Sequence, residues 1–264
     1  MKKIFYEVAF AILMIVLIIP LIFIFIWAFT KSWPYPQILP SEFTLRGISQ
    51  ILDPKNNILP VLLFSVRLSA LVAFISILIS IPAGKALAIY SFPGKNLFHM
   101  LVMSPFIIPA VSVAMGVHIL MIKAGIANTV TGVILIHLAT TVPYSIRIFI
   151  EIYNLIGDSY EIQGRVLGAN PFQTFAYVTL PVLGEAISSA FSITFIVSFS
   201  HYFLTFIIGG GRVLTFPILM FPFIQSGDRT IGSVYSFAFI LTGTLVIAIF
   251  DRVLSFRYKH LRKT

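Results

Sequence analysis

The 264-residue chain contains no cysteine and few charged side chains. Without cysteine, neither a disulfide framework nor a thiolate metal site can form. Asp, Glu, Lys and Arg together make up only 10% of the residues, whereas a soluble domain carries about 25%. Hydrophobic residues make up 58%. The composition therefore excludes an ordinary soluble domain and predicts a membrane protein.

The chain also lacks a nucleotide-binding loop. The pattern Gly-x4-Gly-Lys-Ser/Thr is missing, because Gly84-Lys85 and Gly94-Lys95 have neither the earlier glycine nor the following hydroxyl residue. The sequence offers no pair of carboxylates facing one cavity, no nucleophile–base set and no His/Asp/Glu cluster with metal-ligand spacing. We therefore expect no enzymatic activity, no cofactor, no metal site and no catalytic residue.

What the chain has in place of charge is a series of long apolar runs. A helix that crosses the hydrocarbon core needs about 20 mainly apolar residues. The runs are continuous rather than alternating, which favours helices over barrel strands. The sequence predicts an all-α membrane protein with one domain, residues 1–264, and six transmembrane helices at 8–30, 61–90, 97–122, 126–152, 182–208 and 230–252.

Two further segments are apolar but short. Residues 213–227 are uncharged and contain Pro217, Pro222 and Gly227, which disfavour a spanning helix. We expect an outer loop or a segment at the membrane surface, and a re-entrant segment is the alternative. Residues 43–52 have apolar side chains at roughly helical spacing. They predict a short surface helix, either a cap on the bundle or a contact for a soluble partner.

The distribution of basic residues predicts the orientation. With six spans and a cytoplasmic N-terminus, eleven of the 18 Lys and Arg residues lie on the inner side and seven on the outer side. Both termini are therefore predicted to be cytoplasmic, in a multi-pass protein of the cell (inner) membrane. The net charge of +9 comes from residues that flank the spans, so we expect the lipid bilayer, and no nucleic acid, as a partner.

Residues 158–181 form a polar island between the fourth and fifth runs. Asp158 or Ser159 can cap a helix, which we expect to stop at Gly168, because glycine accepts the left-handed conformation. Asn170-Pro171 predicts the start of a second short helix. The expected result is a stiff helix–turn–helix on the cytoplasmic side.

The island resembles the EAA loop of binding-protein-dependent import permeases of the ATP-binding-cassette class, in the methionine-importer-like superfamily. That pattern reads Glu-Ala-Ala, three residues, Gly, nine residues, Ile, one residue, Leu-Pro. Gly168, Val178 and Leu180-Pro181 occupy the last positions here, and Leu180-Pro181 is expected to start the fifth span. The first three positions depart from the pattern, since they are Ile162-Gln163-Gly164, and Glu161 lies one residue early.

Weaker resemblances extend over about residues 61–252. Asn128–Gly132, Val142–Tyr144 and residues 207–217 are similar to the branch that imports polyamines, iron, sulfate, thiamine and phosphonate. The resemblance implies a polyamine, spermidine or putrescine, as the solute, with phosphonate, iron, thiamine or sulfate as alternatives. A secondary carrier and a non-transporting membrane scaffold are rivals from other classes.

The resemblance also implies partners: two copies of an ATP-binding subunit that hydrolyses ATP, a second permease subunit, and an external solute-binding protein. The degenerate first motif positions suggest that the two permeases form a heterodimer. Coupling to the ATPase is assigned to ten consecutive residues: Tyr160, Glu161, Ile162, Gln163, Gly164, Arg165, Val166, Leu167, Gly168 and Ala169. The residues that line the substrate pathway cannot be assigned.

Three histidines in the apolar runs are further candidates. His118, His137 and His201 fall in the third, fourth and fifth runs. An ionisable residue inside a membrane is a candidate for a pathway. We expect instead that each one is hydrogen-bonded to a neighbouring helix.

Overall fold

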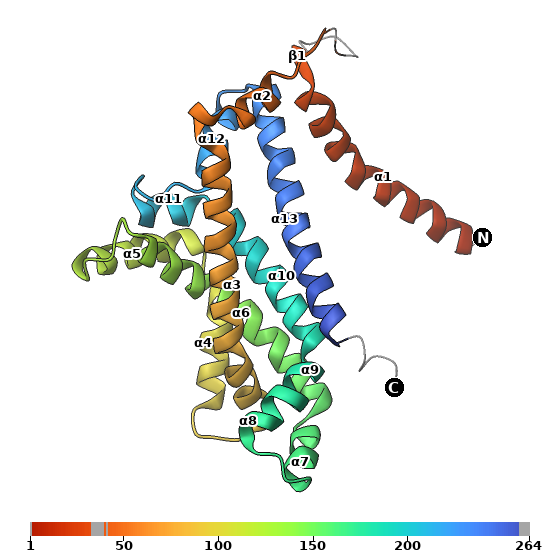
Figure 1. Cartoon of the computed structure of the whole chain (residues 1–264), viewed down its shortest axis with the longest axis vertical. Helices are drawn as coiled ribbons and strands as arrows, with labels where there is room; N and C mark the ends of the chain where they lie inside the picture. Colours follow the sequence, from red (N-terminus) through yellow and green to blue (C-terminus); the bar gives the residue numbers. More distant parts are fainter. Residues whose placement is uncertain (1, 33–39, 41, 259–264) are drawn as a thin grey trace. The chain divides into compact units, whose positions relative to one another are not determined.

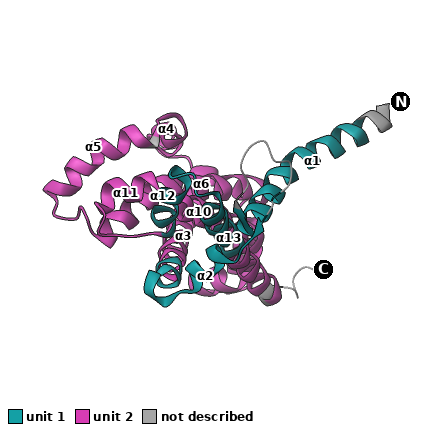
Figure 2. Ribbon diagram, turned by 90° about the horizontal axis from the view of Figure 1, so that it is seen from above, with its two compact units in different colours: residues 1–62, 216–242 teal, residues 63–215, 243–264 magenta. Residues whose placement is uncertain are grey.

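The computed structural model describes residues 2–32, 40 and 42–258. The described part is almost entirely helical, which confirms the all-α class. It divides into two compact units (Figure 2). Unit 1 comprises residues 1–62 and 216–242, and unit 2 comprises residues 63–215 and 243–264.

The helices and strands follow one another as labelled in Figure 1. The long helices are α1 (Lys2–Ala28), α3 (Ile58–Ile89), α6 (Val130–Ile156) and α13 (Arg229–Tyr258). The shorter elements are β1 (Thr30–Ser32), β2 (Glu42–Phe43), α2 (Arg46–Leu52), η1 (Pro54–Asn56), α4 (Lys95–Ile107), α5 (Ala110–Lys123), α7 (Ser159–Val166), α8 (Pro171–Thr174), the π-helical η2 (Phe175–Thr179), α9 (Leu180–Val182), α10 (Gly184–Ser200), α11 (Phe203–Gly209) and α12 (Phe216–Gln225).

Four of the described helices are long and apolar enough to cross a membrane: Tyr6–Ala28, Ile58–Ile89, Val130–Ile156 and Arg229–Phe256. Two bent helix pairs raise the number to six if each pair is one span. The chain is therefore a multi-pass membrane protein.

The third expected span, 97–122, is broken in the middle. Helix α4 ends at Ile107 and α5 begins at Ala110, with a bend of 110° between the two. Pro109 accounts for the break, because a proline disfavours the helical conformation of the residue before it. Ile108 accordingly has extended backbone angles, φ −87° and ψ 126°.

The fifth expected span, 182–208, is also interrupted. Helix α10 ends at Ser200 and α11 begins at Phe203, and His201 is extended with φ −67° and ψ 97°. No proline or glycine lies at this break. Tertiary hydrogen bonds hold it, because Thr140 Oγ1 of α6 lies 2.8 Å from Nε2 of His201. Nothing in the local sequence therefore predicts this interruption of the helix.

Unit 1 contains residues 43–52 and most of the segment 213–227. The expected surface helix is confirmed as α2, which packs on α13 so closely that a Cβ at Gly47 would lie 2.5 Å from Cγ2 of Val234. An ion pair of 2.6 Å joins Arg46 to Asp228. Residues 213–227, expected to be an outer loop or a segment at the membrane surface, contain the helix α12, Phe216–Gln225. Pro217 lies in its first turn, where no backbone donor is needed.

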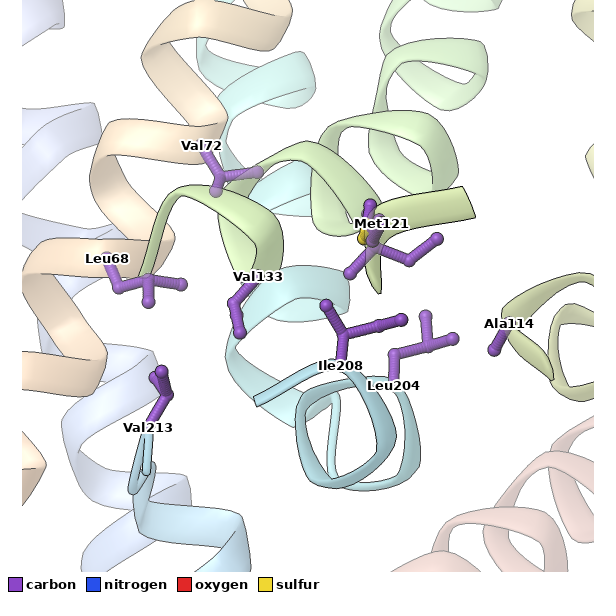
Figure 3. Packing of buried hydrophobic residues seen from close by; sticks show 9 residues of the cluster. Leu68, Val72, Ala114, Met121, Val133, Leu204, Ile208 and Val213 are labelled. Carbon is purple, nitrogen blue, oxygen red and sulfur yellow. The ribbon is translucent and has the colours of Figure 1, made fainter. Parts of the chain in front are cut away.

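A buried apolar cluster of unit 2 joins α3, α5, α6 and α11 (Figure 3). It consists of Leu68, Val72, Ala114, Met121, Val133, Ile136, Leu204, Ile208 and Val213. A second cluster, Leu87, Ile146 and Ile150, joins α3 to α6 nearer their C-terminal ends. The two clusters hold α3 and α6 together along their lengths, and α6 leads directly into the polar island.

Candidate functional site: the 158–181 helix–turn–helix

The polar island forms a helical hairpin at one end of unit 2 (Figure 1). Helix α7 supplies the first arm, and the helical run Pro171–Val182, made of α8, η2 and α9, supplies the second. The expected helix–turn–helix is therefore present in the structure.

The turn between the arms is a Schellman motif centred on Gly168. The N–H of Gly168 donates to the carbonyl of Arg165 at 2.9 Å, and the N–H of Ala169 donates to the carbonyl of Gly164 at 3.1 Å. Gly168 has φ +88°, a left-handed conformation that glycine adopts without steric cost. The motif glycine is therefore needed for the backbone conformation of the turn. Close packing does not require it, because nothing lies within 4 Å of a Cβ built there.

The second arm begins with a reciprocal capping box. The side chain of Asn170 accepts from the N–H of Gln173 at 2.9 Å, and the side chain of Gln173 accepts from the N–H of Asn170 at 2.9 Å. Pro171 follows at the first helical position, as expected. Because both ends of the turn are fixed by hydrogen bonds, the hairpin is stiff.

The two arms meet at Gly164, the buried residue of α7. A Cβ at Gly164 would lie 3.4 Å from Cγ2 of Val178 and 3.6 Å from Cγ2 of Thr174. Gly164 occupies the third motif position and Val178 the isoleucine position, so the fixed spacing between them brings the two arms into contact. A larger side chain at Gly164 would push the arms apart.

Glu161 faces the same interior side of α7. Its Oε2 accepts from Nζ of Lys85 in α3 and lies 3.5 Å from Nη2 of Arg165. Its Oε1 accepts from Oγ1 of Thr179 at 3.1 Å. The side chains of Lys85 and Glu161 are only 18% and 13% exposed. Glu161 is therefore mostly buried in these contacts, whereas Ile162, at the first motif position, is exposed.

Many of the exposed side chains of the hairpin are apolar. We define the coupling face as the exposed apolar side chains Tyr160, Ile162, Val166, Leu167, Phe172 and Tyr177. Their exposed fractions range from 49% for Ile162 to 88% for Leu167. Ile162 and Val166 are one helical turn apart, on the side of α7 opposite Glu161 and Gly164. Among the other assigned residues, Gln163, Arg165 and Gly168 are exposed and Ala169 is half-buried.

The second arm does not run straight into the fifth span. Helix α9 ends at Val182, and α10 begins at Gly184 after a bend of 71°. Leu180-Pro181, expected to start the fifth span, lies in α9 just before this bend. Leu183, at the bend, is fully buried, so the corner is anchored in the core of unit 2.

Two other sequence fragments singled out above meet at a second place in unit 2. Thr129 caps α6 by accepting from the N–H of Gly132 at 3.0 Å. The N–H of Asn128 donates to the carbonyl of Ile208 at 2.8 Å, and a Cβ at Gly210 would collide with the Asn128 side chain. An apolar groove of about 730 Å³ lies beside this junction, between α5 and the end of α11.

The histidines divide into two kinds. His137 is buried and lies 2.9 Å from both Oγ of Ser198 and Oγ1 of Thr205, which confirms the expected bonds to neighbouring helices. His201 bonds to Thr140, as described above. His118 is half-buried and lines the groove beside α11. In the part of the chain that the structure describes, no three His, Asp or Glu side chains are grouped to hold a metal.

The left-handed turn leads to a prediction for Gly168. The variant Gly168→Val should insert and fold, because no neighbour lies within 4 Å of the new Cβ. The β-branched side chain strains the left-handed backbone by about 2 kcal/mol, so the turn should change shape. In an importer of the class that the island resembles, ATP-driven uptake should then fall while ATP hydrolysis continues. Gly168→Asn is the matched control, since asparagine tolerates this conformation. Normal uptake by the valine variant would contradict the role of the turn.

Residues 76–263 match the family described as "binding-protein-dependent transport system inner membrane component". The chain is 26% identical over 196 residues to the arabinooligosaccharides transport system permease protein AraQ of Halalkalibacterium halodurans, covering 69% of this chain and 67% of that protein. It is 24% identical over 255 residues to the sulfate transport system permease protein CysW of Escherichia coli K12, covering 89% of this chain and 81% of that protein.

A solved structure is similar over nearly the whole chain. It is a crystal structure of a bacterial ABC transporter involved in the import of the acidic polysaccharide alginate. A chain of that transporter superposes with a TM-score of 0.74, with 95% of both chains covered and 15% sequence identity. At this identity the likeness shows the fold.

Proposed function

Because the chain belongs to the family of binding-protein-dependent transport system inner membrane components, and is thus a permease subunit of an ABC importer, we propose that residues 158–181 couple it to the ATPase. The observation that carries the proposal is the coupling face: a hairpin with a hydrogen-bonded turn presents large apolar side chains outward. On a segment expected to lie outside the bilayer, an exposed apolar patch of this kind marks a protein–protein contact. The residues assigned to coupling are Tyr160 to Ala169.

The mechanism follows from the stiffness of this hairpin. Closure of two ATP-binding subunits on ATP moves the hairpin as a rigid body, and the bend at Leu183 passes the movement to α10. A flexible loop would absorb the displacement, whereas a rigid element transmits it. The spans then alternate between outward and inward openings. This requires the hairpin to face the cytoplasm, as the distribution of basic residues indicates.

The other proposed partners follow from the importer architecture. An external binding protein delivers the solute, and a second permease completes the pathway. Ile162 stands where the motif has glutamate, so we infer that the second permease is a different protein that carries the acidic motif. Purification of the assembled complex tests this, because a single permease species would rule out the heterodimer.

The solute is proposed to be a sugar or an oxyanion rather than a polyamine. The relatives AraQ and CysW are named for arabino-oligosaccharides and sulfate, and a polyamine has no such support. A polyamine cation needs carboxylates along its path. The acidic residues of the spans, such as Glu151, Glu185 and Asp251, lie near the ends of the spans instead. Sulfate was among the alternatives from the sequence, and the sugar class is added by the relatives.

Uptake by the reconstituted importer tests this function. Proteoliposomes with the permease pair, the ATPase and the binding protein should accumulate labelled oligosaccharide or sulfate only when ATP is supplied. Removal of this chain should abolish accumulation. Uptake that continues without the chain would support a scaffold role, and uptake driven by an ion gradient without ATP would support a secondary carrier. Accumulation of spermidine would restore the polyamine assignment.

A further inference from the structure

We infer that the Glu161–Lys85 ion pair is an internal latch, and that Lys85, which lies outside the coupling loop, is a positioning residue for coupling. The inference rests on the proposed function of residues 158–181. In this inference, the Glu161 carboxylate binds Lys85 within the permease rather than a residue of the ATPase. The ATPase then binds the apolar surface of the hairpin.

The first argument is the direction of the Glu161 carboxylate. One oxygen accepts from Lys85 in α3 and the other from Thr179 in η2. The carboxylate thus joins three elements of unit 2: α3, α7 and the second arm of the hairpin. With only 13% of its side chain exposed, Glu161 is committed to these contacts. Arg165, whose side chain is 57% exposed, is the only charged group of α7 on the outside.

The second argument is the place where Lys85 sits on α3. The preceding residue, Gly84, is in close contact with α6: a Cβ there would lie 2.5 Å from Cβ of Phe149. Leu87, two residues later, packs in the cluster with Ile146 and Ile150 of α6. The end of α3 that carries Lys85 is therefore packed against α6. A force on the Lys85 ammonium group is transmitted to a helix that this packing holds in place.

The third argument is that the latch provides a second path for the movement. The chain itself connects the hairpin to the spans, through the end of α6 and the bend at Leu183 into α10. The ion pair adds α3 through Lys85, which is 76 residues away in sequence from Glu161. A partly buried ion pair is poorly screened by salt, so it holds its geometry better than a surface pair. Movement of α7 should therefore carry α3 with it.

Charge reversal of the pair tests the latch in the complete importer. Lys85→Glu should leave the ATPase bound and active but lower the solute transported per ATP by about tenfold, a typical size for coupling between sites. Glu161→Lys, which lies in the segment assigned to coupling, should lower the same ratio. The double exchange, Lys85→Glu with Glu161→Lys, should restore part of the wild-type ratio, because the new ammonium group at position 161 would also lie near the Arg165 guanidinium. Glu161→Gln keeps the size and the Thr179 contact, so it should fold and show an intermediate loss.

Lys95→Glu is the matched control, because the Lys95 ammonium contacts only the carbonyls of Ala88 and Tyr90 among its described hydrogen bonds. It should leave the ratio unchanged. Wild-type coupling in the single variants and Glu161→Gln, or a double exchange as poor as the single variants, would overturn the latch. Loss of ATPase binding in the single variants would overturn it as well, since Glu161 would then be a partner contact. Failure of the wild-type chain to bind any ATPase would instead refute the proposed function.

Discussion

Leu167→Asp should abolish ATP-driven uptake while leaving the permease folded. The Leu167 side chain is 88% exposed at the tip of the hairpin, so the substitution removes almost no contact within the chain. In the assembled importer, the new carboxylate would be buried against an apolar partner without a compensating charge. Central interface residues of this kind contribute about 2 kcal/mol or more, which is about thirtyfold in the dissociation constant. Co-purification of the ATPase and uptake in proteoliposomes measure the effect.

Phe256→Asp is the control for this prediction. Phe256 is 81% exposed on α13, outside the hairpin, so it separates loss of the coupling face from a general effect of a new surface charge. We expect this variant to bind the ATPase normally. If Leu167→Asp also binds it normally, the coupling face is not the docking surface.

Gly84→Val should prevent α3 and α6 from packing. A Cβ at Gly84 would lie 2.5 Å from Cβ of Phe149 and 3.2 Å from the backbone nitrogen of Ile150. Backbone atoms cannot rotate away, so the two helices must separate. Overpacking of a core costs about 1–3 kcal/mol, and the second and third side-chain carbons of valine add to it. We expect little folded protein, and a thermal midpoint in detergent well below that of the wild type.

Gly243→Ala provides the comparison for the packing prediction. Gly243 is also a helical glycine, in α13, but nothing lies within 4 Å of a Cβ built there. Its thermal midpoint should stay close to the wild-type value. Equal midpoints for Gly84→Val and wild type would show that α3 and α6 approach each other less closely than described.

Features that depend on residues adjacent in the sequence could be predicted from the sequence alone. The stop at Gly168 and the restart at Asn170–Pro171 are local: one needs a left-handed backbone and the other a capping side chain. The apolar runs follow from the thickness of the bilayer. The assignment of Tyr160 to Ala169 to coupling stays a prediction, which the variants above would test.

Breaks in the helices were harder to predict, because proline alone does not decide them. Helix α3 continues through Pro82 and α6 through Pro143, whereas Pro109 separates α4 from α5. The interruption at His201 has no proline at all, and contacts with α6 stabilise it. In a membrane, freed backbone groups can be satisfied by neighbouring helices, so the outcome at each position depends on what packs against it.

The amino-acid sequence by itself determined that this chain lies in a membrane, that it is helical, and that residues 158–181 make a stiff turn between two helices. These properties are set by hydrophobic length, capping and backbone sterics, all of which act over a few residues. Only the tertiary structure decided which way the hairpin faces: Glu161 inward to Lys85, and Ile162 and Leu167 outward. The physical reason is that a partly buried carboxylate needs an opposite charge and hydrogen-bond donors. The ammonium group of Lys85 and the hydroxyl group of Thr179 provide these for Glu161, and both residues lie in other helices.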